Sequence, residues 1–369
     1  MQMEKVLGRR EGELSVYDVF TPTSSATISA INRTSLRSSL SRALAVPGRQ
    51  LFVYGRSGAG KSTLVSSVLA ERKMNRVIVL RCTDSTTVSS MVRAGAHQFG
   101  LEEIDAVDQQ RVAIELGRAG NCVVIEDAHR LPPAERKKLL DAAKLFSDLG
   151  SQYPQLKLII IAALDAPSQF APIETEVGSR IEEIEVPSMS VAELARIVRA
   201  GGEWLNVDTS TIEAAIAGVS AGSAAIAHQL ALIAFERSGA TCFVPESIQI
   251  ERDAIVEAFE DFLRSIPRDI MWRIGIATSG RDSEARTDLL DALSTFDSRG
   301  ADVADLTVAG RAGRNPFGPQ VTEIVADLSS PTGGNLIEVS TGGTVRFSRP
   351  LLHSYWSIKR YLRGGPASD

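Results

Sequence analysis

The nine residues GRSGAGKST, at positions 55–63, have the types and the spacing of a polyphosphate cradle. They match the pattern G-x-x-x-x-G-K-[ST], in which glycines let the backbone wrap so tightly that successive N–H groups converge on anionic oxygens. The lysine adds a positive charge, and the hydroxyls add ligands for a metal ion. The predicted phosphate-binding residues are Gly55, Ser57, Gly58, Ala59, Gly60, Lys61, Ser62 and Thr63.

Two side chains of this loop have specific expected roles. We expect Lys61 to place its charge between the β- and γ-phosphates of a nucleotide, and Ser62 to ligate Mg²⁺. The apolar run QLFVYG (residues 50–55) predicts a buried strand before the loop, and residues 61–72 predict a helix after it. A helix that begins at the loop directs the positive end of its dipole toward the phosphates.

A pair of carboxylates ends another apolar run, NCVVIED, at residues 121–127. Hydrolysis of a phosphate bond needs a carboxylate near the metal and a second group that orients or deprotonates the attacking water. Because consecutive side chains of a strand point to opposite faces, Glu126 and Asp127 can address different partners. Together with Lys61 they are the candidate catalytic residues at this point.

The elements that must position these residues form an alternating series. Near-continuous runs of Val, Ile and Leu alternate with helical segments, which predicts a parallel α/β sheet with strands buried on both faces. The predicted strands are residues 50–55, 76–82, 121–127, 156–164 and 181–186. Cys82 and Cys122 lie in these strands and are expected to be buried, reduced thiols.

After Pro187 the strands stop. The predicted helices of the next region are residues 191–204, 210–218, 223–238 and 247–266. Three short helices (288–296, 301–309 and 321–328) and a β-hairpin then give the outline of a winged helix. The expected domains are an N-terminal, extended arm (1–30), an α/β core (31–187), a helical lid (188–274) and a winged helix (275–369), with a linker at 275–286.

The segments GRSGAGKST and VVIEDAHRL resemble those of the P-loop ATPases of the AAA+/STAND group, and the resemblance covers roughly residues 30 to 265. It implies a P-loop NTPase parallel sheet with a helical lid, with ATP and Mg²⁺ as cofactors. Position by position, Glu126 takes the metal-side acid, beside Ser62, and Asp127 takes the water-activating acid. The commoner order is Asp followed by Glu, so we expect slow turnover.

Other segments extend this resemblance. INRTSLRSSLSRAL resembles the segment before the loop that helps to hold the adenine. Arg180 precedes the fifth strand, where it is either an arginine finger for a neighbouring subunit's γ-phosphate or an arginine that caps a helix or pairs with a nearby glutamate. The polar residue of the sensor strand is Asp165 or Ser168. Ala224 and Ala225 replace a second sensing arginine, which fits a STAND-type switch or an ATPase completed by another subunit.

The C-terminal stretch TVRFSRPLLHSYWSIKRYL resembles the end of bacterial and archaeal ATPases whose last domain is a winged helix. Its expected recognition helix, residues 321–328, is acidic and apolar, although DNA contact would favour base-reaching side chains there. From Ala285 onward, nine Arg and Lys balance nine Asp and Glu, so a protein partner is favoured over DNA. Met271, Trp272 and Trp356 are expected to lie in the core rather than to contact a cofactor.

The composition fits this interpretation. The net charge of −5 argues against a broadly basic nucleic-acid coat, and the sequence has no apolar run near 18 residues and no signal-like start, so we expect a cytoplasmic protein without a membrane segment. The predicted function is an ATP-binding, slowly hydrolysing switch that controls a protein partner. By family analogy, a defence system is one setting for such a switch. The alternative is a DNA-binding initiator or transposition-helper ATPase. A homo-oligomer is compatible with both.

Overall fold

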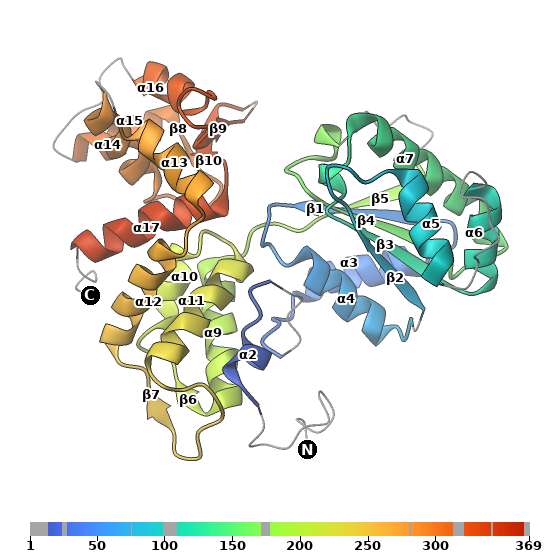
Figure 1. Ribbon diagram of the computed structural model, residues 1–369, viewed down its shortest axis with the longest axis horizontal. Coiled ribbons are helices and arrows are strands. Elements are labelled where there is room, and N and C mark those ends of the chain that lie inside the picture. The colour runs from blue at the N-terminus through green and yellow to red at the C-terminus, as the bar shows by residue number, and fades with distance from the viewer. Residues whose placement is uncertain are drawn as a thin grey trace. The chain divides into compact units, whose positions relative to one another are not determined.

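The computed structural model describes residues 14–23, 28–74, 76–98, 109–170, 178–279, 282–312, 321–340 and 342–364. These residues divide into two compact units (Figure 1). The sheet unit is Asn32–Pro187, and the helical unit combines Met1–Ile31 with Ser188–Asp369. The chain therefore passes between the units twice, at residues 31–32 and at residues 187–188.

A five-stranded parallel sheet forms the centre of the sheet unit, in the order β2-β3-β4-β1-β5. Its strands are β1 (Gln50–Gly55), β2 (Val77–Arg81), β3 (Cys122–Glu126), β4 (Lys157–Ala163) and β5 (Ile181–Glu185). Each falls within a predicted strand, and the P-loop NTPase sheet is confirmed. Cys82 and Cys122 are buried as expected.

Helices cover both faces of this sheet (Figure 1). They are α3 (Thr34–Ala45), α4 (Lys61–Glu71), α5 (Val88–Gln98), α6 (Gln109–Arg118) and α7 (Pro133–Asp148). Side chains alternate along β1, so Leu51 and Val53 pack with α3 and α4, while Phe52 packs with α5, α6 and α7. Because the strands are buried on both sides, their sequences lack the alternation of a half-exposed sheet.

Gly55, the last residue of β1, lies directly against the backbone that leaves β5. Its φ is +142°, and a Cβ atom at this position would lie 2.1 Å from the carbonyl oxygen of Val186. The Val186 N–H donates to the Tyr54 carbonyl at 2.7 Å. A side chain at position 55 would therefore have to separate two hydrogen-bonded segments.

Gly55→Ala is expected to destabilise the sheet unit by roughly 3 kcal/mol, through backbone strain and the clash with Val186. Urea unfolding followed by fluorescence would measure this. Gly95→Ala on α5 is the matched control, since a Cβ atom there has no neighbour within 4 Å. Equal unfolding midpoints for the two variants would contradict the steric argument.

Three longer helices, one short helix, two short strands and the N-terminal segment make the first part of the helical unit. The elements are α2 (Val16–Val19), α9 (Val191–Leu205), β6 (Val207–Asp208), α10 (Glu213–Val219), α11 (Ala224–Arg237), β7 (Ile248–Gln249) and α12 (Arg252–Arg264). The predicted helix 247–266 was wrong at its start, because β7 pairs with β6 and α12 begins at Arg252. The arm includes a helical turn, α2, and Phe20 behind it fits against Gly201 of α9.

The remaining elements of the helical unit are helices and three short strands. They are α13 (Arg268–Ala277), α14 (Ser283–Leu293), β8 (Ala301–Asp302), α15 (Val303–Ala312), α16 (Val321–Leu328), β9 (Ile337–Val339), β10 (Thr344–Phe347) and α17 (Pro350–Gly364). Strands β9 and β10 form the predicted hairpin, and β8 pairs with β10. The expected linker at 275–286 was wrong, because α13 occupies its start and α14 its end.

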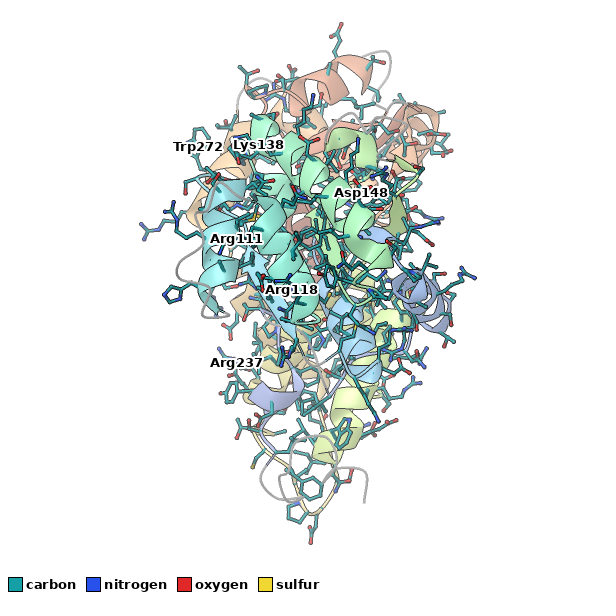
Figure 2. All side chains as sticks on the ribbon, turned by 90° about the vertical axis from the view of Figure 1, so that its right-hand side faces the viewer. Arg111, Arg118, Lys138, Asp148, Arg237 and Trp272 are labelled. Atoms are coloured by element: carbon teal, nitrogen blue, oxygen red, sulfur yellow. The ribbon has the colours of Figure 1, made fainter. Side chains whose placement is uncertain are left out.

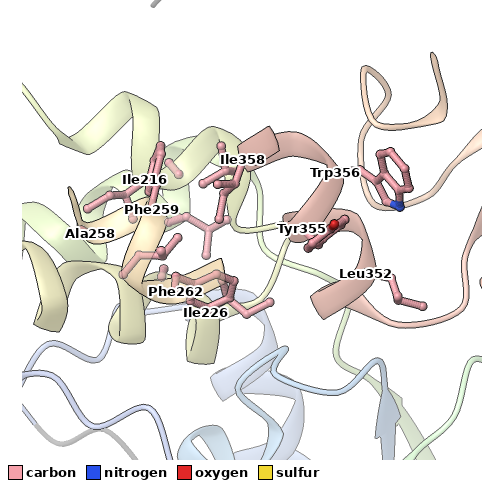
Figure 3. Close-up of a cluster of buried hydrophobic side chains, with 14 of the residues drawn as sticks. Ile216, Ile226, Ala258, Phe259, Phe262, Leu352, Tyr355, Trp356 and Ile358 are labelled. Carbon is pink, nitrogen blue, oxygen red and sulfur yellow. The ribbon is translucent and has the colours of Figure 1, made fainter. Parts of the chain in front are cut away.

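Two aromatic residues of this region have opposite environments. Trp272 on α13 is 68% exposed, so its expected core position, like that of the exposed Met271, was wrong (Figure 2). Trp356 on α17 is buried (Figure 3). The ring of Tyr361, also on α17, lies 5.1 Å from Phe259 of α12 in an edge-to-face contact, so α17 packs on the first part of the unit. No helix within the described ranges is long and apolar enough to cross a membrane.

Candidate nucleotide-binding site

The candidate phosphate loop connects β1 to α4 through glycines in left-handed conformations. Gly58 has φ +77°, and Gly60, the N-cap residue of α4, has φ +88°. Residues with a Cβ atom seldom adopt this region, so glycine at both positions permits the sharp turn into the helix. The loop thereby places the N-terminus of α4, with its unpaired backbone N–H groups, at the carboxyl edge of the sheet.

Lys61 opens α4 and is held against its own loop. Its side chain is largely enclosed, with the residue 8% exposed. The Nζ atom donates to the carbonyl oxygens of Gly55 and Arg56, each at 2.8 Å. Burial lowers the pKa of Lys61 from 10.5 to about 8, and the charge of Asp127 partly opposes this. A buried cation beside helix N–H groups fits a polyphosphate, whose negative charge would offset the desolvation of the ammonium group.

ATP affinity is expected to fall as the pH rises through about 8, because Lys61 in the free protein then loses its proton. A bound triphosphate favours the charged lysine, so the complex keeps the proton to higher pH. ATP affinity is therefore lost above about pH 8, and the loss approaches tenfold for each further pH unit. Titration with a fluorescent ATP analogue between pH 7.5 and 9.5 would measure it, and a flat profile would contradict the assignment. A Lys61→Arg variant that still binds should give a flat profile, since arginine stays charged.

The two acids end β3 in different environments. Glu126 is the last residue of the strand, its side chain is 12% exposed, and its Oε2 atom lies 2.8 Å from Nη2 of Arg81. Arg81 is its partner in the register of β2 and β3. Asp127 follows with φ +55°, a side chain that is 47% exposed and an Oδ2 atom 3.9 Å from Nε of Arg81. The charge of Asp127, in addition, raises the pKa of Lys61.

His129 and Arg136 support the segment that follows the acids. The Ala163 N–H, at the end of β4, donates to Nδ1 of His129 at 3.1 Å. Burial lowers the pKa of His129, which fits a neutral ring that accepts this bond. Arg136 donates to the carbonyl oxygens of Leu131 at 2.8 Å and of His129 at 2.5 Å.

The same guanidinium group also reaches the segment after β4. It donates to the carbonyl oxygens of Gln169 and Phe170, each at 3.3 Å, and it lies over the Phe170 ring. Arg136 therefore ties the chain after β3 to the chain after β4. Sequence reasoning missed it, although its position four residues before Leu140, on the buried face of α7, was a signal.

The sensor candidates lie in this second segment. Asp165 is half-buried and its N–H donates to Oε1 of Gln169 at 3.0 Å, whereas Ser168 is exposed in the 3-10 helix Pro167–Gln169. A bridge between Gly55 and Leu164 places the start of the segment beside the phosphate loop. Asp165, which directly follows Leu164, is thus closer along the chain to this bridge than Ser168 is.

Arg180 lies at the other edge of the sheet. It immediately precedes β5, and because all five strands are parallel, their amino ends lie opposite the phosphate loop and the acids. Its side chain pairs with Asp148 at the end of α7, a residue labelled in Figure 2. The structure therefore does not bring Arg180 to the site of its own chain. The pairing agrees with the ion-pair alternative, with an aspartate as the partner.

The chain is similar to known ATPases in part of its sequence and in its fold. Residues 47–170 match the family model described as an AAA domain. Among curated proteins, none matches the chain. Among solved structures, the Walker-type ATPase PABY2304 of Pyrococcus abyssi is 17% identical, with a TM-score of 0.55 over 89% of this chain and 96% of that one.

Two Aeropyrum pernix proteins have the same fold. The ORC2 protein, in ADPNP–ADP complexes, is 14% identical with a TM-score of 0.52, over 92% of this chain and 96% of that one. The ORC1 protein, in complex with DNA, is 16% identical with a TM-score of 0.52, over 95% and 98%. The AAA domain matched over residues 47–170 and the phosphate loop on this fold support a P-loop ATPase of the AAA+ class.

Proposed function

We propose that this ATPase is a slow, STAND-like switch, in which the nucleotide held by the sheet unit controls how the helical unit engages a protein partner. Two features support the proposal. The candidate phosphate loop and both acids lie in one compact unit, whereas the lid and the expected winged helix lie in the other. The chain joins these units at two places, so a change in the sheet unit has two covalent routes to the helical unit.

The residues of the loop suit a magnesium–ATP complex. In this proposal the loop N–H groups and Lys61 bind the triphosphate, while Ser62 and Glu126 ligate Mg²⁺, which supplies positive charge to the phosphate oxygens when bound. Asp127 orients and deprotonates water. Arg81 neutralises Glu126 and competes for its carboxylate, which supports the expectation of slow turnover.

The observation that carries the choice of a protein partner is the charge of the expected winged helix. The buried face of α16 is apolar, and Glu323 lies on its exposed side. Three arginines of this region are already paired with carboxylates, within 2.9 Å in each case: Arg286 with Asp327, Arg346 with Glu338, and Arg363 with Asp291. Phosphate binding would have to break these pairs, and an acidic α16 would repel DNA.

Two measurements on the full chain test this proposal. Limited proteolysis with ADP and with a non-hydrolysable ATP analogue should give different patterns, and identical patterns would contradict a switch. Fluorescence anisotropy with a 30-base-pair duplex should show only weak, salt-sensitive binding, on the order of 10⁻⁴ to 10⁻⁶ M, without a nucleotide effect. Tight binding that requires ATP would instead support the initiator or transposition-helper alternative, which the fold of the DNA-bound ORC1 structure makes worth testing.

The mass of the purified chain with the same two nucleotides addresses the role of Arg180. A dimer or ring that forms only with the ATP analogue, and that Arg180→Ala abolishes, would support a finger supplied to a neighbouring subunit. A constant monomer would contradict the finger and favour a role for Arg180 within its own chain, as in its pair with Asp148.

A further inference from the structure

We propose that Arg33 couples the phosphate loop to the two places where the chain passes between the units. The inference rests on the proposed switch function and names the residue through which the loop acts. Arg33 precedes α3 as its N-cap residue, two positions after Ile31, so it stands at the first passage. Its side chain reaches the second passage, as the following contacts show.

One nitrogen of the Arg33 guanidinium group contacts both the loop and the second passage. Nη1 donates to the carbonyl oxygen of Pro187 at 3.0 Å and to that of Ala59 at 3.4 Å. Pro187 is the last residue of the sheet unit, and Ala59 lies inside the phosphate loop. All three residues belong to the sheet unit, so these contacts are internal to one compact body.

The carbonyl of Ala59 is well placed to report the state of the loop. The Ala59 carbonyl and the Gly60 N–H belong to one planar peptide group, so neither can turn without the other. Loop N–H groups are the ones that would face a phosphate. If the Gly60 N–H turns toward a phosphate oxygen, the Ala59 oxygen must turn with it, and its position relative to Arg33 changes.

Lys61 adds a reason for the loop backbone to move. Its Nζ atom now donates to the carbonyl oxygens of Gly55 and Arg56. A triphosphate competes for the same ammonium protons with full negative charges, and charge-assisted bonds are stronger than those to neutral carbonyls. The carbonyls that Lys61 releases lie in the segment that ends at Ala59.

A second connection runs through the backbone itself. Val186, next to Pro187, donates its N–H to the Tyr54 carbonyl and leaves no room for a side chain on Gly55. The start of the loop, at Gly55, is therefore packed against the backbone at Val186 that leads into the second passage. Arg33 adds the side-chain contact from the end of the loop to the same place.

Both passages are anchored on the side of the helical unit as well. Met189 N–H donates to the Gly222 carbonyl at 2.9 Å, and the Ser29 hydroxyl donates to the Val19 carbonyl at 2.6 Å. Few backbone torsions remain between these anchors and the contacts of Arg33. A displacement of the loop is therefore expected to appear as rotation at residues 31–33 and 187–188.

Arg37 provides a matched control on the same helix. It lies one turn after Arg33 and bonds to α4 instead, with Nη1 2.7 Å from the Ser67 hydroxyl and Nη2 2.8 Å from Glu71. Its removal deletes an arginine and an ion pair from α3 without deleting a contact to Ala59 or Pro187. Arg33→Lys is a second variant, because an ammonium group keeps the charge but lacks the planar fork of guanidinium.

The experiment is hydrogen exchange of the full chain without nucleotide, with ADP and with a non-hydrolysable ATP analogue, together with ATP titration. In Arg33→Ala, peptides that cover residues 186–189 should exchange at least about tenfold faster without nucleotide, as expected when a local contact opens. The difference between ADP and the analogue at both passages should disappear. ATP affinity should fall no further in Arg33→Ala than in Arg37→Ala, because both arginines lie in the segment expected to help hold the adenine. In hydrogen exchange, Arg33→Lys should restore only part of the protection, and Arg37→Ala should behave as the wild type.

The outcomes separate this inference from the switch itself. If the wild type shows no difference between ADP and the analogue, the switch fails. Even then, faster exchange at residues 186–189 in Arg33→Ala, but not in Arg37→Ala, would support the contact that Arg33 makes between the passages. If Arg33→Ala and Arg37→Ala exchange alike in every state, the coupling role is overturned. A hundredfold loss of ATP affinity in Arg33→Ala would also overturn it, because Arg33 would then belong to nucleotide binding.

Discussion

Lys61→Ala is expected to lower ATP affinity at least about a hundredfold and to abolish phosphate release, because charged hydrogen bonds to phosphate contribute roughly 1.5–3 kcal/mol each. Lys61 is the enclosed cation of the loop, at the start of α4. Its two carbonyl acceptors within the loop hold Nζ where a phosphate would meet it. Calorimetric titration with magnesium–ATP and a phosphate-release assay would measure both effects.

Two further variants protect this prediction from a folding artefact. Lys61→Met keeps the aliphatic volume while it removes the charge, so its ATP affinity should fall as far as that of Lys61→Ala. Lys137→Ala removes an exposed lysine of α7 and should bind as the wild type. If Lys61→Met folds, by circular dichroism, and still releases phosphate at the wild-type rate, the loop is not the catalytic site.

Asp127→Asn is expected to keep ATP affinity within about threefold and to slow hydrolysis by roughly 10² to 10⁴, the usual contribution of a general base. The amide keeps the size of the side chain but accepts no proton. Asp127 is the more exposed of the two acids and acts on Lys61 through its charge, so it stands where a reacting water could be reached. Single-turnover phosphate release with saturating ATP would separate the chemical step from binding.

Glu126→Gln is the matched variant, and a magnesium titration distinguishes the two roles. If Glu126 ligates the metal, Glu126→Gln should raise the Mg²⁺ concentration needed for half-maximal turnover at least about tenfold, in the range found when metal-site residues are altered. Asp127→Asn should leave that concentration unchanged. The opposite pattern would exchange the roles, with Asp127 as the metal ligand. Unchanged turnover in both variants would sink the catalytic assignment altogether.

Much of the sheet unit was predictable from the sequence because its signals are local. Strand β1, the loop and α4 are consecutive, and three glycines with one lysine specify the turn between them. Apolar runs identified all five strands, since a strand buried on both faces has few positions for polar residues. The carboxylate pair was recognisable for the same reason, as the first polar residues after such a run.

Elements that depend on distant partners were predicted less well. Residues 247–249 had a helical pattern, yet β7 pairs with β6, some forty residues earlier in the chain. The stretch at 275–286 looked like a linker from its glycines and charges, although α13 continues through its first residues. Trp272 is exposed because α13 turns that side outward. Local propensity cannot supply pairings that close long loops.

The types and spacing of residues 55–63 and 121–127 by themselves predicted the chemistry of an ATPase. Only the tertiary structure decided which partners the charged groups take: Glu126 pairs with Arg81 across two strands, Arg180 with Asp148, and Arg33 reaches both Ala59 and Pro187. An ionic group can pair with any opposite charge that the fold brings within about 4 Å, and a cationic donor can also bond to a carbonyl oxygen. Folding selects among these partners by geometry, and that selection connects the phosphate loop of this ATPase to the places where its chain leaves the sheet unit.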